Sequence, residues 1–289
     1  MRITHRLPRL ATAVGVALAA LSLSAASASP KVRLLWADGA SGRLRVEDGG
    51  KGGLPVVFVH GLGGSRAAWA EQLAHVRATR RAAALDLHGM GESAPSPSGD
   101  YSVESFASDV AAALEALRIE RAVLVAHSLG GSVIGAFAAR HPQRAAALLF
   151  CDPAGDLSHF PRQELEAQWL SKLAPESYDA YLPVWFGGML GAARPEVREQ
   201  VMRQVKLTPR EVMAGAARSL AAYDPKPALE GFKGPMLTVV TPANQKPFSL
   251  QNLVSNLPAR VIDGTSHWVM MDKPAEFDAA MDEFLATVK

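Results

Sequence analysis

The segment Val123–Ser132 reads Val-Leu-Val-Ala-His-Ser-Leu-Gly-Gly-Ser and combines a strand, a turn and the start of a helix. Val123–Ala126 is a short apolar run that continues from Ala122, and such runs are typical of buried parallel strands. Leu129–Arg140 has the composition and length of a helix. Ser128 is therefore expected on a sharp turn between the strand and the helix.

Small residues flank Ser128 where a sharp turn needs them. Ala126 lies two residues before it, and Gly130 and Gly131 follow. Such a turn lifts the serine hydroxyl above the sheet, and the helix N-terminus offers backbone N–H groups to a developing oxyanion. The alternative interpretation is an ordinary serine at a helix N-terminus. The sequence on either side is needed to choose between these two interpretations of Ser128.

The pattern resembles the nucleophile elbow G-x-S-x-G of the α/β-hydrolase superfamily, with Ala126 in place of the first glycine. The resemblance covers nearly all of the chain after residue 28. It implies an α/β fold with a mostly parallel central sheet, flanking helices and a helical cap inserted after the sixth strand. The alternation of apolar strands and helical segments also predicts a parallel, doubly wound sheet.

The expected strands and core helices follow this alternation. The strands are expected at Val32–Ala37, Leu44–Glu47, Pro55–Val59, Ala82–Leu85, Val123–Ala126, Ala146–Cys151, Met236–Thr241 and Ala259–Ile262. Besides Leu129–Arg140, core helices are expected at Arg66–Arg77, Val103–Leu117, Ser249–Asn256 and Pro274–Val288.

Strand signals disappear between Pro153 and about Gly234, where only helical segments are found. A connection of this length with helices of its own is typical of a lid or cap. The predicted organisation is a signal peptide (1–28), a first core part (29–153), the cap segment (154–234) and a second core part (235–289).

The first 28 residues have the pattern of a secretory signal peptide. Arg2, Arg6 and Arg9 make a basic start, Leu10–Leu23 is apolar and uncharged, and Ala26-Ser27-Ala28 is a small-residue cleavage site. We expect cleavage after Ala28, no stable membrane span afterwards, and a secreted or periplasmic protein. An uncleaved N-terminal anchor is the alternative.

The charge balance gives no indication of a nucleic-acid partner. Removal of the three arginines from the 30 basic residues leaves 27, against 28 acidic residues. No basic run is found elsewhere. The chain has 289 residues, of which 48% are hydrophobic, enough for one large α/β core. Its single cysteine, Cys151, cannot form a disulfide within the chain.

The run His60-Gly61-Leu62-Gly63-Gly64 follows an expected strand and resembles the oxyanion loop of the superfamily. The resemblance implies that the backbone N–H groups of Leu62 and Leu129 form the oxyanion hole. A plain glycine-rich turn is the alternative. The later run Asp86-x-x-Gly89-x-Gly91-x-Ser93 also resembles a loop of the superfamily, and we interpret Asp86 and Ser93 as structural.

His267 lies after the last strand and before the final helix, where the superfamily has its catalytic histidine. The resemblance therefore implies that His267 is the general base for Ser128. His127 adjoins the serine but is expected to point elsewhere, and His60 is expected to shape the oxyanion loop.

The catalytic acid is where the sequence departs from the pattern. Many members of the superfamily have it after the strand that ends here at Thr241, but Asn244 occupies that position. Asp152 closes the preceding strand, where some members have their acid, and we predict it as the third catalytic residue. The alternatives are Asn244 as an orienting amide, and Asp156 or Asp263 as the acid.

These residues predict a serine hydrolase that acts on small carboxylic esters. Serine as nucleophile argues against the epoxide hydrolases and haloalkane dehalogenases of this fold, which use aspartate. We predict substrate contacts from Trp185, Phe186 and Trp268. No zinc-ligand spacing, P-loop or dinucleotide motif is found, so neither a metal nor a cofactor is expected.

Other activities share this set of residues. The resemblance leaves open hydrolysis of lactones, amides, thioesters or carbon–carbon bonds, as well as cofactor-free haloperoxidase activity. Because the usual position of the acid holds Asn244, a non-catalytic binding protein with this fold is a further alternative.

Overall fold

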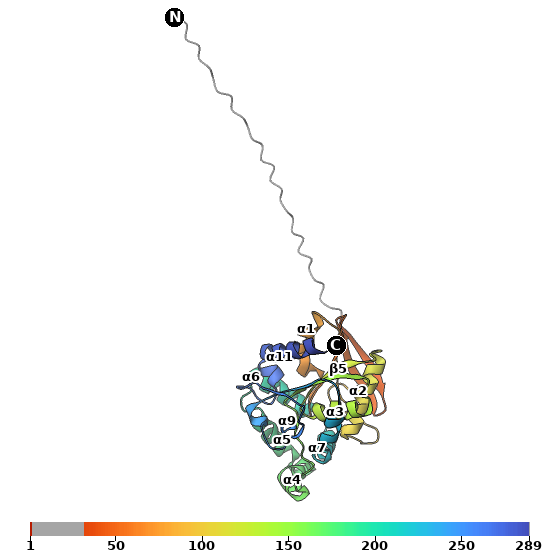
Figure 1. Cartoon of the computed structure of the whole chain (residues 1–289). Coiled ribbons are helices and arrows are strands. Elements are labelled where there is room, and N and C mark those ends of the chain that lie inside the picture. The colour runs from red at the N-terminus through yellow and green to blue at the C-terminus, as the bar shows by residue number, and fades with distance from the viewer. Residues whose placement is uncertain (2–31, 289) are drawn as a thin grey trace.

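The computed structural model describes Met1 and residues 32–288 of the chain (Figure 1). Apart from Met1, the predicted signal peptide lies outside the described residues and stays a prediction. None of the helices in the described part is both long and apolar enough to cross a membrane.

In the described part of the chain, eight strands form one sheet in the order β1-β2-β4-β3-β5-β6-β7-β8. The first two pairings, β1 with β2 and β2 with β4, are antiparallel, and every later pairing is parallel. The prediction of a mostly parallel sheet is therefore confirmed. The strands are β1 (Arg33–Gly39), β2 (Gly42–Gly49), β3 (Val56–Val59), β4 (Ala82–Leu85), β5 (Ala122–His127), β6 (Ala145–Cys151), β7 (Met236–Val240) and β8 (Ala259–Val261).

Helices cover both faces of the sheet (Figure 1). On one face α1 (Ala70–Arg77) contacts α11 (Pro274–Thr287), and on the other α2 (Val103–Ala116) packs along α3 (Leu129–Arg140). This arrangement buries both faces of the central strands β3, β4, β5 and β6, which explains why these strands are almost entirely apolar.

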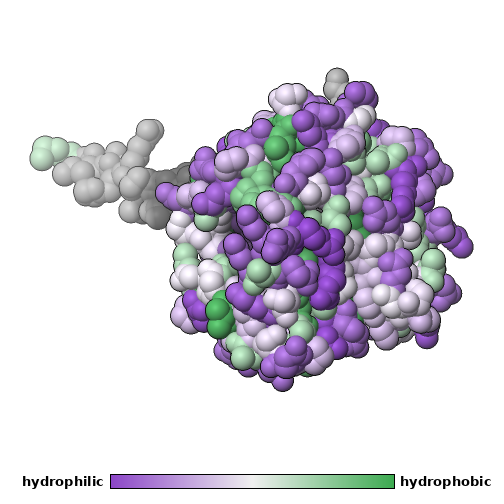
Figure 2. Space-filling model, turned by 90° about the horizontal axis from the view of Figure 1, so that it is seen from below, coloured by the Kyte–Doolittle hydropathy of each residue, from purple (hydrophilic) through white to green (hydrophobic). Residues whose placement is uncertain are grey.

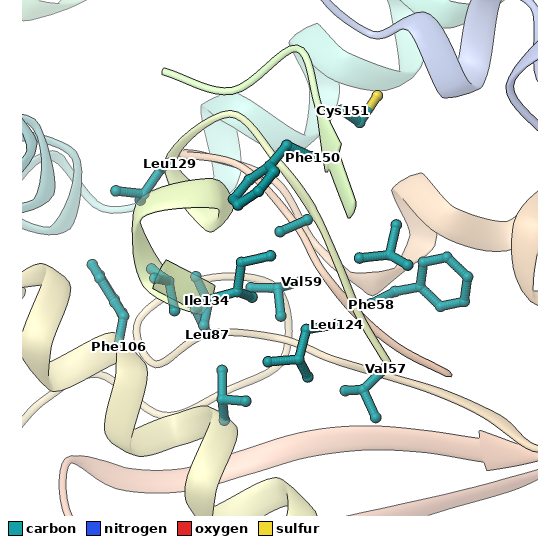
Figure 3. Close-up of a cluster of buried hydrophobic side chains, with 14 of the residues drawn as sticks. Val57, Phe58, Val59, Leu87, Phe106, Leu124, Leu129, Ile134, Phe150 and Cys151 are labelled. Carbon is teal, nitrogen blue, oxygen red and sulfur yellow. The ribbon is translucent and has the colours of Figure 1, made fainter. Parts of the chain in front are cut away.

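The core is built where β3, β5 and β6 meet α2 and α3 (Figure 3). Strand residues such as Phe58, Leu124 and Phe150 are fully buried, as are Phe106 of α2 and Ile134 of α3. The central strands are thereby held between two helix layers, and their carboxyl ends become fixed points for functional groups.

The cap segment (154–234) contains only helices and loops in the structure, between β6 and β7. Its face in Figure 2 is mostly hydrophilic, with hydrophobic residues in smaller groups between the polar ones. Its helices are α4 (Arg162–Gln168), η2 (Leu170–Leu173), α5 (Pro175–Met189), α6 (Pro195–Leu207), α7 (Arg210–Ala222) and α8 (Lys226–Gly231).

Two predicted helices differ from the structure. The helix expected at Arg66–Arg77 begins as a 3₁₀ turn, η1 (Arg66–Trp69), before α1. The helix expected at Ser249–Asn256 is only α9 (Leu250–Leu253), because Val254 is already extended, with φ −111° and ψ 108°. Two further short helices are η3 (Pro242–Asn244) and α10 (Val269–Asp272).

Gly130 allows the first turn of α3 to approach β3 closely. A Cβ atom at this position would lie 2.7 Å from the carbonyl oxygen of His60 and 2.8 Å from that of Val59. Both neighbours are backbone atoms that cannot rotate away. The glycine therefore sets the distance between the nucleophile helix and the central strand.

We expect Gly130→Ala to destabilise the fold by about 1–3 kcal/mol, because the added methyl group must displace backbone. Gly187→Ala in α5 is the matched control, since a Cβ there meets no atom within 4 Å. Alanine is the better helix former, so this control should be neutral or stabilising. Urea unfolding of both variants measures the difference, and equal free energies of unfolding would contradict the packing argument.

Candidate active site

Ser128 lies on a strained turn between β5 and α3. Its φ of 52° and ψ of −121° are unusual for a residue with a side chain, and such a conformation costs about 1–3 kcal/mol. The backbone holds it in place: Ser128 N–H donates to Cys151 O at 3.2 Å, and Ser128 O accepts from Gly131 N at 2.9 Å. The turn thus has the geometry expected of a nucleophile elbow.

Asp152 and His267 meet directly, although 115 residues separate them in the sequence. Nδ1 of His267 lies 2.6 Å from Oδ2 of Asp152. The carboxylate accepts the Nδ1 proton, so Nε2 of His267 is left as the basic nitrogen. This is the orientation that a general base for a serine requires.

The other oxygen of Asp152 is surrounded by donors. Oδ1 accepts from Thr241 N at 2.8 Å, from Thr241 Oγ1 at 3.1 Å and from Asn244 Nδ2 at 3.2 Å. Burial favours the neutral acid, but the hydrogen bonds from His267, Thr241 and Asn244 outweigh it and lower the pKa of Asp152. The buried side chain is therefore a carboxylate at neutral pH.

The other predicted candidates for the acid do not contact His267. Asn244 donates to Asp152 and to Pro153 O instead. Asp156 Oδ1 accepts from the Ser158 backbone and hydroxyl at 2.8 and 2.7 Å. The Asp263 side chain is 86% exposed and faces Lys273. Of the four, only Asp152 is in a position to orient the imidazole.

Ser128 and His267 line the same cavity, of about 720 Å³. No hydrogen bond joins their side chains within the described residues. In ligand-free enzymes this bond is often long and tightens only when substrate binds. The structure thus brings the predicted serine, histidine and aspartate to one wall of one cavity.

The predicted oxyanion loop approaches the nucleophile very closely at Gly61. A Cβ atom there would lie 2.8 Å from His127 Nδ1 and 2.9 Å from Ser128 Cβ, so this position requires glycine. Leu62 lines the cavity and Leu129 begins α3. Within the described residues, neither of their N–H groups donates to a protein acceptor, as the predicted oxyanion hole requires.

His60 fixes the shape of this loop, as expected from the sequence. Its Nδ1–H donates to Gly61 O at 2.7 Å, and its Nε2 accepts from Leu87 N at 3.0 Å. Burial lowers the pKa of His60, against smaller opposing effects from Asp86 and Gly61. The neutral His60 side chain thus joins the loop after β3 to the loop after β4 through two hydrogen bonds.

Asp86 and Ser93 have the structural role that was expected of them. Asp86 accepts from the backbone N–H groups of Arg66 at 2.6 Å and Glu92 at 2.9 Å. Ser93 Oγ donates to Asp86 O at 2.6 Å and accepts from Arg45 N at 2.8 Å. Neither residue lines the cavity.

His127 differs from the expectation that it points away from the site. Its ring centroid lies 4.6 Å from that of His267, and its Nε2–H donates to His267 O at 2.9 Å. Burial and the adjacent His267 lower the pKa of His127 to about 3, so the ring is a neutral donor. Its position beside Ser128 was the only sequence signal for this contact.

The cap segment also supports His267. The backbone N–H of His267 donates to Met189 O, at the end of α5, at 3.2 Å. Asp272 accepts from Ser266 N and from Arg194 N, at 2.8 and 3.0 Å, and so joins the histidine loop to the cap. The sequence carried no signal for either link.

The predicted substrate-contacting residues Trp185, Phe186 and Trp268 all line the cavity. They belong to an aromatic series in which Trp169 packs edge-on against Trp185 at 5.3 Å. Apart from Asp152 and the histidines, Lys246 is the only charged side chain among the lining residues. The lining of the cavity is therefore mostly apolar.

One group of residues in the described part of the chain could hold a metal ion. The ligand atoms of Asp156, His159 and Asp224 lie within 4.8 Å of one another. None of the three lines the cavity, and the arrangement around Ser128 requires no metal for its chemistry.

Comparisons with known proteins agree with this fold. Residues 55–194 match the family model of the alpha/beta hydrolase fold. The chain is 27% identical over 266 residues to 2-hydroxymuconate semialdehyde hydrolase of Pseudomonas sp. strain CF600, covering 84% of this chain and 90% of that protein.

Another relative matches over a shorter range. The acetyltransferase component of the acetoin cleaving system of Pseudomonas putida is 43% identical over 110 residues, and the match covers 38% of this chain and 29% of that protein.

Among solved structures, a thermophilic esterase from Thermogutta terrifontis superposes with a TM-score of 0.74 at 25% identity. The match covers 88% of this chain and 98% of the esterase. Together with the eight-stranded sheet and the family-model match, these similarities show that the chain has the α/β-hydrolase fold.

Proposed function

We propose that this protein is a serine hydrolase that cleaves carboxylic esters through an acyl-enzyme intermediate. The observation that supports this most is the Asp152–His267 hydrogen bond of 2.6 Å on the wall of the cavity that the strained Ser128 also lines. A merely structural serine would need neither the strained turn nor an oriented imidazole nearby.

In the first step Ser128 Oγ attacks the ester carbonyl carbon while Nε2 of His267 takes the hydroxyl proton. Negative charge moves to the carbonyl oxygen, which accepts hydrogen bonds from the N–H groups of Leu62 and Leu129. Asp152 stabilises the imidazolium that forms. The tetrahedral intermediate then collapses, and His267 returns the proton to the leaving alcohol.

In the second step water attacks the acyl group on Ser128. His267 Nε2 removes a proton from the water, and the same two N–H groups bind the second oxyanion. Collapse releases the carboxylic acid and restores the serine hydroxyl. His127 is neutral. If it were protonated, its positive charge would repel the His267 imidazolium and compete with it for the Asp152 carboxylate.

The cavity supports an apolar acyl group of moderate size. Its volume of about 720 Å³ and its aromatic wall suit a hydrophobic chain or ring, since ligand sites bury mainly apolar surface. The Thermogutta terrifontis esterase gives additional support for esters at 25% identity. From the basic and apolar pattern of residues 1–28 we propose that the enzyme acts outside the cytoplasm.

We expect a fluorophosphonate probe to label the natural protein and Ser128→Ala to abolish both labelling and hydrolysis of p-nitrophenyl esters. The variant should keep its circular dichroism spectrum, because the glycines around the turn are unchanged. An unlabelled natural protein would refute the serine hydrolase proposal. Faster turnover of amides or lactones than of esters would refute the ester assignment.

We expect Asp152→Asn to lower kcat by about three to four orders of magnitude with little change in KM, because charge stabilisation of the imidazolium is lost. Asp263→Asn is the matched control, since this exposed carboxylate does not contact His267. Steady-state kinetics of both variants provide the comparison. A silent Asp152→Asn would exclude Asp152 as the acid.

We expect Trp185→Ala to raise kcat/KM for long-chain relative to short-chain esters by roughly tenfold, because the cavity gains the volume of the indole. Val184→Ala is the control: Val184 is 67% exposed and does not line the cavity. A series of p-nitrophenyl esters of increasing length gives the ratio. An unchanged ratio would show that Trp185 has no part in acyl selection.

A further inference from the structure

Asn244 is held so that its amide nitrogen faces the catalytic carboxylate. Nδ2 lies 3.2 Å from Asp152 Oδ1 and 2.9 Å from Pro153 O. On the other side, Oδ1 accepts from the Ser249 hydroxyl at 2.8 Å. The backbone O of Asn244 accepts from Gln251 Nε2 at 2.6 Å, so the residue is anchored from both sides.

The chemistry of these partners fixes the direction of the amide. A peptide carbonyl and a carboxylate can only accept hydrogen bonds, so the atom between Pro153 and Asp152 has to be a donor. The Ser249 hydroxyl can donate to the amide oxygen. An amide satisfies all three partners at once, whereas an ionised carboxyl at this position would face two acceptors.

Asn244 also belongs to the turn that supplies the other donors to Asp152. Thr241 precedes η3, and its Oγ1 accepts from Asn244 N at 3.3 Å while donating to Asp152 Oδ1 at 3.1 Å. All donors to Oδ1 therefore come from the chain that follows β7. Oδ2 is left for His267 alone.

We propose that Asn244 is a positioning residue whose amide holds Asp152 ionised and directed at His267. An ionised carboxylate at position 244 cannot perform this role. This inference rests on the proposed function in taking Asp152 as the catalytic acid. Asn244 acts through Asp152 and has no contact with His267 among the described hydrogen bonds.

Several titratable groups surround this cluster. His267 contacts Asp152 directly, and the buried His127 and Cys151 are near enough for their pKa values to respond to its charge. Lys246 follows two residues after Asn244 and lines the same cavity. All of these groups, Lys246 included, are present in the natural protein and in every variant at position 244, so their own titration enters both sides of the kcat ratio.

The decisive experiment is Asn244→Asp, with kcat measured from about pH 5 to about pH 8. The charge of Asp152 should raise the pKa of the introduced carboxyl well above its usual value. In its protonated form the new group donates to Asp152 as the amide does. Once ionised, it repels Asp152 and Pro153 O, so the ratio of variant to natural kcat should fall roughly tenfold or more as pH rises.

Asn252→Asp is the matched control. Asn252 is exposed on α9, and its side chain donates to Lys246 O rather than to the site. The same chemical change there should leave the ratio flat across the pH range. Asn244→Leu removes the donor without adding charge, and we expect roughly tenfold lower kcat, unchanged KM and a flat ratio.

The His267 Nδ1 proton gives a readout that does not need turnover. Its far-downfield NMR signal should be retained in Asn252→Asp and shift or disappear in Asn244→Asp as pH rises. If the ratio of variant to natural kcat stays flat across pH and the NMR signal of Asn244→Asp is unchanged, the inference about Asn244 is wrong. Fluorophosphonate labelling of the natural protein would in that case still support the proposed function. An unlabelled natural protein would refute the function, and the NMR signal would still decide the role of Asn244.

Discussion

The buried carboxylate of Asp152 is the constraint on which the site depends. A carboxylate removed from water costs several kcal/mol unless other groups replace its hydration. Here the replacement comes from Thr241 and Asn244 after β7 and from His267 after β8. The charge is stable only if three adjacent strand ends hold their register, so the order of β6, β7 and β8 is itself part of the site.

The ends of β5 and β6 carry backbone strain. Ser128 and Asp152 both have positive φ, 52° and 41°, without being glycine. Conformations of this kind cost about 1–3 kcal/mol each and persist only where the surroundings determine them fully. Hydrogen bonds from Ser128 N to Cys151 O and from Asp152 N to Val239 O supply that determination. The proposed nucleophile and the proposed acid are thus held by the strand pairings across β5, β6 and β7.

Local patterns in the sequence were enough to predict the strands, the elbow and the oxyanion loop, because each depends on residues that are neighbours in the chain. The choice of acid was harder, since Asp152 and His267 are 115 residues apart and only strand register brings them together. The position of His127 was predicted wrongly for a related reason. Its partner is a backbone carbonyl 140 residues away. Every residue has a backbone carbonyl, so the residue types in the sequence do not indicate which one accepts this hydrogen bond.

The cap segment illustrates what sequence reasoning could not reach. Its helices were predictable from composition, and two of its aromatic residues, Trp185 and Phe186, were predicted as substrate contacts. That Met189 O accepts the backbone N–H of His267, and that Asp272 ties the same loop to Arg194, follow only from the folded arrangement. The segment that lines one side of the cavity therefore also supports the loop that carries His267. The proposed substrate cavity and the proposed general base therefore share part of their support, because the cap segment both lines the cavity and bonds the loop of His267.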